Sequence, residues 1–296
     1  MIDARQFQEL RPYLFSIAYR MLGRASEAED VIQDAWLRAQ QSADAPDSTR
    51  AWLSTVVTRL CLDRLKSAQA TREEYVGPWL PEPVLPDAFA PDATVLQDES
   101  ITLAFLVLLE RLSPAERAAF LLREVFDYEY RDVAGILDVN EAATRQLVHR
   151  ARERLAQGRK RFEPDPERRR EVVHRFLAAA REGDLAGLEE LLAADAHWVA
   201  DGGGKVPAAT RVVQGASPVA RFFLGIWTKG AAVPDRWRVE LREINGEPAL
   251  LAFVDGGLDT VFVFSIGDER IQSVQAVRNP EKLAWLRGRL APTPEG

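Results

Sequence analysis

The fold of this chain is decided by residues 130–155, YRDVAGILDVNEAATRQLVHRARERL. The first half repeats apolar residues at helical spacing, and the second half predicts another helix that is rich in arginine. Between them lies Asp138-Val139-Asn140, a tight turn in which Asn140 can cap the second helix. Ala142 and Ala143 are small residues at the start of that helix, as entry into a DNA major groove requires. The stretch therefore predicts a helix-turn-helix.

Positive charge is concentrated in the second of these helices. The chain has a formal net charge of −7, yet residues 145–161 hold seven cations against one acid, Glu153. In a groove-binding helix, some of these side chains read base edges and others bind phosphates. The predicted DNA contacts are Arg145, Gln146, His149, Arg150 and Arg152, of which the first three face the bases. A solvated helix face is the alternative interpretation.

The bulk composition limits the class of protein. No apolar run is long enough to span a bilayer, and the polar start MIDARQFQEL is not a secretory signal. Cys61 is the only cysteine, which excludes an intramolecular disulfide and fits the reducing cytoplasm. The three histidines are far apart in sequence, which argues against a structural zinc site. We therefore expect a cytoplasmic protein with no metal and no cofactor.

Helical periodicity also dominates the N-terminal part, from Phe7 to about Lys66. Gly23 ends a first predicted helix. Ser26 and Glu29 form a capping-box pattern for a second, and Ser48 or Thr49 can cap a third. The prediction is a helical bundle over residues 1–75.

A proline-rich segment follows, VGPWLPEPVLPDAFAPDA at residues 76–93. Five prolines exclude a regular helix and favour an extended, semi-rigid connector. Its apolar residues, Trp79 above all, are unusual for a solvated linker. We therefore expect the linker to dock in a groove; a simple tether is the alternative.

Helices resume over residues 94–163, where Ser113 to Glu116 carries an N-cap, a proline and a capping-box acid. Pro164 and Pro166 mark the next boundary. Residues 168–296 are mixed, with two helices predicted at 168–181 and 185–193. The predicted strands, joined in part by turns at Asn245-Gly246 and Gly267-Asp268, are residues 197–200, 236–244, 249–254, 260–266 and 271–277. Helices followed by antiparallel strands indicate an α+β domain.

Three segments resemble the sigma-70 family, in particular its extracytoplasmic-function sigma factors. Residues 15–39 are similar to the part that grips the polymerase clamp helices. Residues 49–67 resemble the part that melts and reads the minus-10 element, and residues 109–155 the minus-35 domain. WLPEP at 79–83, DGGGK at 201–205 and NPEKL at 279–283 resemble the marks of a sigma-J-like group.

The resemblance implies a multidomain chain. All-α helical sigma domains, an N-terminal helical bundle plus helix-turn-helix, would be followed by an α+β SnoaL-like cone domain at residues 168–296. It implies a sigma factor that binds core RNA polymerase and promoter DNA. The implied core-binding residues are Glu29, Asp30, Gln33, Asp34 and Leu37. Arg59, Arg64 and Lys66 would contact DNA near the minus-10 element.

We expect the C-terminal domain to act as a regulatory module in cis, because a tethered domain gains effective concentration over a separate regulator. It would contact the sigma part or the linker. The expected regulatory contacts are Trp79, Leu80, Pro81, Glu82, Pro83, Asp201, Gly202, Gly203, Gly204, Lys205, Asn279, Pro280 and Lys282. Lys205 is expected to reach Glu82 or nearby acids.

An enzyme is the rival hypothesis for the C-terminal domain. Relatives of the implied fold include isomerases and cyclases, so Asp201 could act as a base with His197 or Lys205 nearby. Fold analogy alone does not establish activity, and three consecutive glycines favour a flexible loop over a rigid catalytic site. A small ligand could instead occupy a cavity lined by Trp227, Trp237, Phe253 or Phe262.

Overall fold

The computed structural model describes residues 2–41, 48–72, 75–89, 101–156 and 165–290. The chain forms two compact units. The N-terminal unit holds residues 1–74, 87–101 and 105–159, and the C-terminal unit holds residues 75–86, 102–104 and 160–296. The predicted linker at 76–93 is thus divided, and its first part belongs to the C-terminal unit. Among the described residues, no helix is both long and apolar enough for a bilayer.

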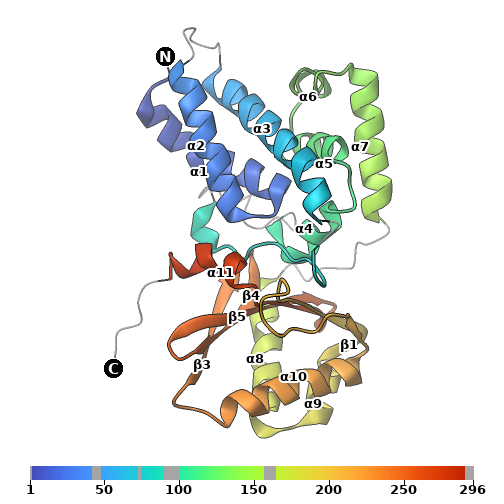
Figure 1. The fold of residues 1–296 in the computed structure, drawn as a ribbon. Helices are drawn as coiled ribbons and strands as arrows, with labels where there is room; N and C mark the ends of the chain where they lie inside the picture. The colour runs from blue at the N-terminus through green and yellow to red at the C-terminus, as the bar shows by residue number, and fades with distance from the viewer. Residues whose placement is uncertain (1, 42–47, 73–74, 90–100, 157–164, 291–296) are drawn as a thin grey trace. The chain divides into compact units, whose positions relative to one another are not determined.

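Three helices open the N-terminal unit: α1 (Ala4–Leu22), α2 (Ala25–Gln41) and α3 (Thr49–Arg72) (Figure 1). Gly23 ends α1 in the left-handed conformation at φ 69°, as predicted. The capping box predicted at Ser26 is wrong, because α2 begins at Ala25 and Ser26 lies inside its first turn. Ser48 caps α3, accepting the amide of Ala51 at 3.3 Å.

The second half of this unit contains the helix-turn-helix. The elements are α4 (Leu103–Leu109), α5 (Pro114–Phe120), the π-helical turn η3 (Leu121–Val125), α6 (Tyr130–Leu137) and α7 (Glu141–Ala156). Ser113 and Glu116 form the predicted capping box. Asp138 adopts φ 57° in the turn, and Asn140 accepts the amide of Ala143 at 2.8 Å. The start predicted near Thr94 lies outside the described residues.

The C-terminal unit is built on one mixed six-stranded sheet, in the order β2-β1-β6-β5-β4-β3. Its strands are β1 (Leu192–Asp201), β2 (Val213–Gln214), β3 (Trp237–Ile244), β4 (Glu247–Val254), β5 (Gly257–Gly267) and β6 (Arg270–Val277). β1 pairs with β6 in parallel, whereas the sequence pattern predicted antiparallel strands. The first hairpin turn is Asn245-Gly246 as predicted, but the second uses Asp268 and Glu269, one residue later than expected.

Three helices cover one face of this sheet: α8 (Pro166–Glu182), α9 (Leu185–Glu190) and α10 (Ala216–Ala231) (Figure 1). Their apolar faces and the inward residues of the strands form one core, centred on Phe176, Trp198 and Phe223. Helix α10 was not predicted, nor was α11 (Pro280–Arg287). The result agrees with the expected fold class, an all-α part with a helix-turn-helix followed by an α+β domain.

Candidate functional sites

Helix α7 presents the predicted DNA-contacting residues to solvent. Its buried residues are Thr144, Val148, Ala151 and Leu155, which share one side of the helix. Residues spaced by three and four positions lie together on a helix, so the side opposite this buried one is exposed. Arg145, Gln146, His149, Arg150 and Arg152 are all exposed. Gln146 and His149 lie near the middle of the exposed side, with Arg150 and Arg152 toward its two edges.

In this structure, Arg145 and Arg152 on the exposed side of α7 interact with nearby side chains of the same unit. Arg145 bonds Glu141 at 3.0 Å and lies 4.3 Å from the ring centre of Tyr130. Arg152 bonds Glu124 at 2.8 Å, which raises the pKa of its guanidinium. These are surface contacts with half-exposed arginines. Such pairs contribute little stability, so phosphate can replace the carboxylates.

The predicted core-binding residues share one side of α2. Asp30, Gln33 and Leu37 are exposed, and Leu37 is 52% exposed despite being apolar. Glu29 forms an ion pair with Arg11. Trp36, by contrast, packs on Phe7 with ring centres 4.7 Å apart, as a core residue does.

Two predicted DNA contacts on α3 have other partners in the N-terminal unit. Arg59 donates to the carbonyls of Gly135 and Ile136 at 3.1 Å each, at the end of α6. Arg64 bonds Asp34 at 3.0 Å, on the predicted core-binding side of α2. Lys66 is exposed. In this conformation, Arg59 therefore joins α3 to the helix-turn-helix.

A second contact between the two halves of the N-terminal unit is buried. Arg117 is 3% exposed and donates to the carbonyl of Met21, at the end of α1, at 2.7 Å. Its guanidinium also pairs with Glu110 at 2.8 Å. Burial lowers the pKa of Arg117 to about 10. Through Arg59 and Arg117, the first three helices are thus joined to the helices of the predicted minus-35 domain.

In the C-terminal unit, the buried carboxylate of Asp201 binds the linker. One oxygen accepts the hydroxyl of Tyr75 at 2.6 Å, and the other accepts the amide of Leu80 at 2.8 Å. The ammonium of Lys282 lies 2.6 Å from Asp201 and also donates to the Leu80 carbonyl. Asp201 is 0% and Lys282 2% exposed. Both polar groups of the Leu80 peptide backbone are therefore bound by one buried ion pair.

The glycine-rich turn after Asp201 is shaped for this contact. The amide of Gly203 donates to Asp201 at 3.0 Å. A Cβ on Gly203 would lie 2.2 Å from the Asn279 amide nitrogen, and Gly203 has φ 60°. Asn279 in turn donates to the Tyr75 hydroxyl at 2.9 Å. Where the sequence predicted a flexible loop, the glycines in this conformation allow close packing against Asn279.

A third attachment lies at the other end of the linker segment. Val84 donates to the side-chain oxygen of Asn245 at 2.9 Å, and its carbonyl accepts the Asn245 amide at 2.9 Å. All residues from Leu80 to Val84 are buried. Trp79 is only partly buried, and the Lys282 ammonium lies 4.3 Å from its ring centre. Leu80 and Val84, rather than Trp79, are thus the deeply buried residues of the linker.

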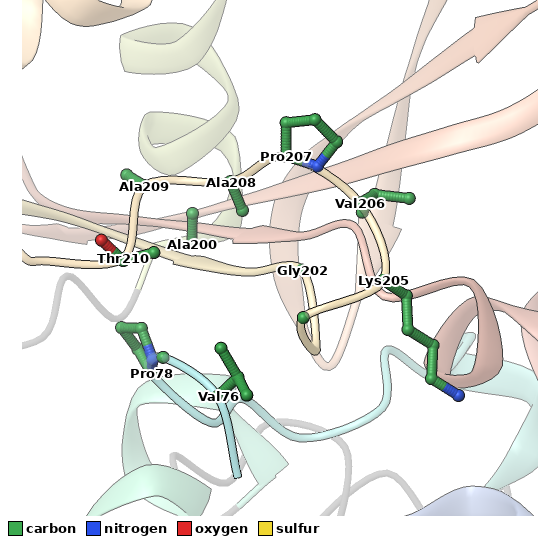
Figure 2. A pocket seen from close by; sticks show the side chains of 12 residues that line it. Val76, Pro78, Ala200, Gly202, Lys205, Val206, Pro207, Ala208, Ala209 and Thr210 are labelled. Carbon is green, nitrogen blue, oxygen red and sulfur yellow. The ribbon is translucent and has the colours of Figure 1, made fainter.

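A pocket of about 360 Å³ lies beside this attachment. Figure 2 shows Val76 and Pro78 of the linker on one side and the loop through Ala208 and Ala209 on the other. Lys205 extends away from it and pairs with Glu281, not with Glu82 as expected. Glu82 itself is 0% exposed.

Sequence reasoning identified the three segments of this linker site but not its atoms. Tyr75 and Asn245 were missed, although Asn245 was noted as a turn residue. Lys282 was expected as one regulatory contact among many, and it is the cation that pairs with Asp201. The assignment of Asp201 as a base is not supported, because its carboxylate is enclosed by structural donors and does not line the large cavity of the domain.

That cavity, of about 650 Å³, opens between the sheet and α10. Trp237 and Phe262 line it, as expected. Trp227 lies behind Trp237 in the core, with ring centres 5.1 Å apart. Phe253 follows the lining residue Ala252 on β4, so its side chain points to the opposite face of the sheet.

Known proteins match the chain over nearly its whole length. Residues 6–71 match the family described as Sigma-70 region 2, and residues 102–155 match the family described as Sigma-70, region 4. The ECF RNA polymerase sigma factor SigJ of Mycobacterium tuberculosis is 38% identical over 294 residues, 95% of this chain and 93% of the relative. The probable ECF sigma factor SigI of that organism is 34% identical, covering 95% and 94%. The crystal structure of SigJ matches with a TM-score of 0.77 at 36% identity, over 95% and 98%.

Proposed function

The chain belongs to the extracytoplasmic-function RNA polymerase sigma factors, and from this premise we propose that its C-terminal unit controls promoter recognition by holding the linker. A sigma factor confers promoter recognition and initiates transcription. The cone domain is the additional part whose role needs a physical account. The observation that carries the proposal is the buried Asp201–Lys282 pair bound to the Leu80 backbone.

We assign core polymerase binding to the exposed side of α2 and promoter binding to α3 and α7. An exposed leucine among acids, Leu37 with Asp30 and Asp34, supports a protein-docking surface. The arginine-rich exposed side of α7 supports a groove-binding helix. On this proposal the chain works in the cytoplasm, with the polymerase.

The N-terminal unit must open before both promoter elements can be bound. Elements named minus-10 and minus-35 are about 25 base pairs apart, or roughly 85 Å at 3.4 Å per base pair. Arg59 on α3 bonds the end of α6 at 3.1 Å, so the two DNA-binding regions are in contact in this conformation. We infer that the linker between them has to extend when the regions separate.

The C-terminal unit opposes that extension by binding the first part of the linker. Residues 75–86 belong to it, and Asp201, Lys282 and Asn245 bind their backbone. On this proposal the C-terminal unit inhibits transcription. Its attachment to the linker restrains opening, and release of the linker favours transcription. A ligand or partner that binds one state better than the other would shift this equilibrium.

Transcription in vitro tests the proposal. We compare the full chain with a chain ending after residue 161, using purified core polymerase and one promoter, over a series of sigma concentrations. The expected result is a higher yield from the truncated chain at matched occupancy of core. Equal yields would mean that the domain is a passenger, and the rival hypothesis of an enzyme would then need testing by substrate screening.

A further inference from the structure

The cavity of the cone domain is a second site, distinct from the linker attachment. It holds about 650 Å³, within the range of small-molecule sites. It opens between α10 and the strands β1, β3, β4, β5 and β6, and Asp201 and Lys282 do not line it. A ligand in the cavity would therefore not contact the ion pair that binds the linker.

Aromatic rings form the walls of this cavity. Trp198 packs against Phe222 and Phe262 with ring centres 5.1 and 5.5 Å apart. On the other side, Trp237 packs against the backbone of α10 at Gly230, where an added Cβ would lie 2.4 Å from the indole. These rings are fixed by their neighbours, so the cavity offers a preformed apolar space. Aromatic walls favour an aromatic ligand, because its ring can stack on them or meet them edge to face.

The charged residues of the lining favour an anion. Three cations, Lys229, Arg236 and Arg278, face one acid, Asp259. Arg278 is fully engaged, with two bonds to Asp259 and one each to Thr260 and Pro207. Arg236 bonds Asp255 outside the cavity.

Lys229 differs from the two arginines. It is exposed on α10 and lines the cavity, and among the described residues it has no ion-pair partner. Its ammonium is therefore available to a bound carboxylate, phosphate or sulfonate.

We propose that this cavity binds a small aromatic anion, with the rings between Trp198 and Trp237 and the anionic group toward Lys229. The probe is 2-naphthoate, and its uncharged match is 2-naphthalenemethanol. Binding to the full chain is measured by calorimetry and by quenching of tryptophan fluorescence. The expected result is saturable binding of both compounds, with tighter binding of the naphthoate.

Two variants of lining residues and one control variant locate the site. Lys229→Gln should weaken the binding of naphthoate roughly fivefold and leave the affinity for the alcohol unchanged, as expected for the loss of one exposed charge pair. Arg221→Gln removes one cation from the exposed side of the same helix, outside the cavity, and should change the binding of neither compound. Ala252→Leu fills the cavity and should weaken both compounds more than tenfold. If that variant does not fold, Ala209→Phe on the lining loop replaces it.

The outcomes are decisive. Absence of saturable binding, or binding unchanged by both Lys229→Gln and the filled variant, overturns the proposal. The proposal is also overturned if Arg221→Gln weakens naphthoate binding as much as Lys229→Gln does. The effect would then come from the overall charge of the protein and not from a contact in the cavity.

The cavity also shares a wall with the linker pocket. Pro207, Ala208 and Ala209 line both, and Figure 2 shows this loop facing Val76 and Pro78. If the proposed control by the linker holds, bound naphthoate should change the exchange rate of the Leu80 amide at least threefold. Binding without such a change overturns the coupling and leaves the site. Absence of binding leaves the linker attachment untouched, so the two proposals fail separately.

Discussion

Replacing Asp201 with asparagine should release the linker from the C-terminal unit. Asp201 accepts four hydrogen bonds, from Tyr75, Leu80, Gly203 and Lys282. The Asp201→Asn variant keeps the shape of the side chain but removes its charge. The amide NH2 group of asparagine, which donates hydrogen bonds, then faces groups that also donate. The ammonium of Lys282, 2% exposed, is then buried without its anion.

The size of the effect follows from burial. Removing one partner of a buried ion pair destabilises by about 3–5 kcal/mol, because the other charge remains buried. If the linker opens locally, exchange of the Leu80 amide should accelerate by roughly two to three and a half orders of magnitude. The measurement is hydrogen exchange followed by mass spectrometry on peptides that cover residues 75–86.

Two comparisons make this prediction specific. Lys282→Met should have a smaller effect, since Asp201 keeps its three other donors. Asp255→Asn breaks an exposed ion pair with Arg236 in the same unit and should leave Leu80 unchanged. If Asp201→Asn leaves exchange of Leu80 as slow as in the parent, the carboxylate does not hold the linker and our reasoning is wrong.

Further predictions concern the promoter, the polymerase and pH. Charge reversal of Asp30 and Asp34 should weaken competition for core polymerase without loss of helicity; normal competition would refute the docking surface. Arg145→Ala should relax base preference in the minus-35 element by about 1–3 kcal/mol, whereas Arg152→Ala should weaken all promoters alike and reduce the salt dependence; an unchanged promoter profile for Arg145→Ala rules out base reading. Burial raises the pKa of Glu247 to about 7, so the native state binds the extra proton and stability should fall as pH rises from about 4.5 to 7. Glu247→Gln should flatten that part of the curve of melting temperature against pH, and an identical slope would contradict it.

The helix-turn-helix could be predicted because its determinants are local. Asp138 and Asn140 shape the turn by their own backbone and side-chain preferences, and both do so in the structure. The predicted strands were also found, but β1 is longer than expected and pairs in parallel with β6. The paired residues, such as Trp198 and Val274, are far apart in sequence, and such pairing leaves no trace in a local pattern.

The linker site illustrates the same limit. The partners of Asp201 at Tyr75, Leu80 and Lys282 are 126, 121 and 81 positions away. Moreover, the Leu80 contacts use backbone atoms, which any residue other than proline would supply. Resemblance to known sequences marked the segments, whereas physical reasoning favoured Trp79 for its size and missed the deeper burial of Leu80 and Val84.

A reversible covalent lock tests the central claim most directly. A Cβ on Gly204 would lie 3.1 Å from the Cβ of Val76, a few tenths of an ångström below the separation in a disulfide. The pair Val76→Cys and Gly204→Cys should therefore join the linker to its loop when oxidised, at some strain from the φ of 70° at Gly204. Cys61 is fully buried, and burial raises the pKa of its thiol, so it should stay out of the reaction.

The measurement is promoter transcription by core polymerase with this double variant, oxidised and then reduced, beside both single-cysteine variants. We predict that oxidation suppresses transcription and that reduction of the same sample restores it, while the single variants respond to neither treatment. Equal transcription by the oxidised and reduced protein, with the disulfide verified by mass, would contradict control through the linker.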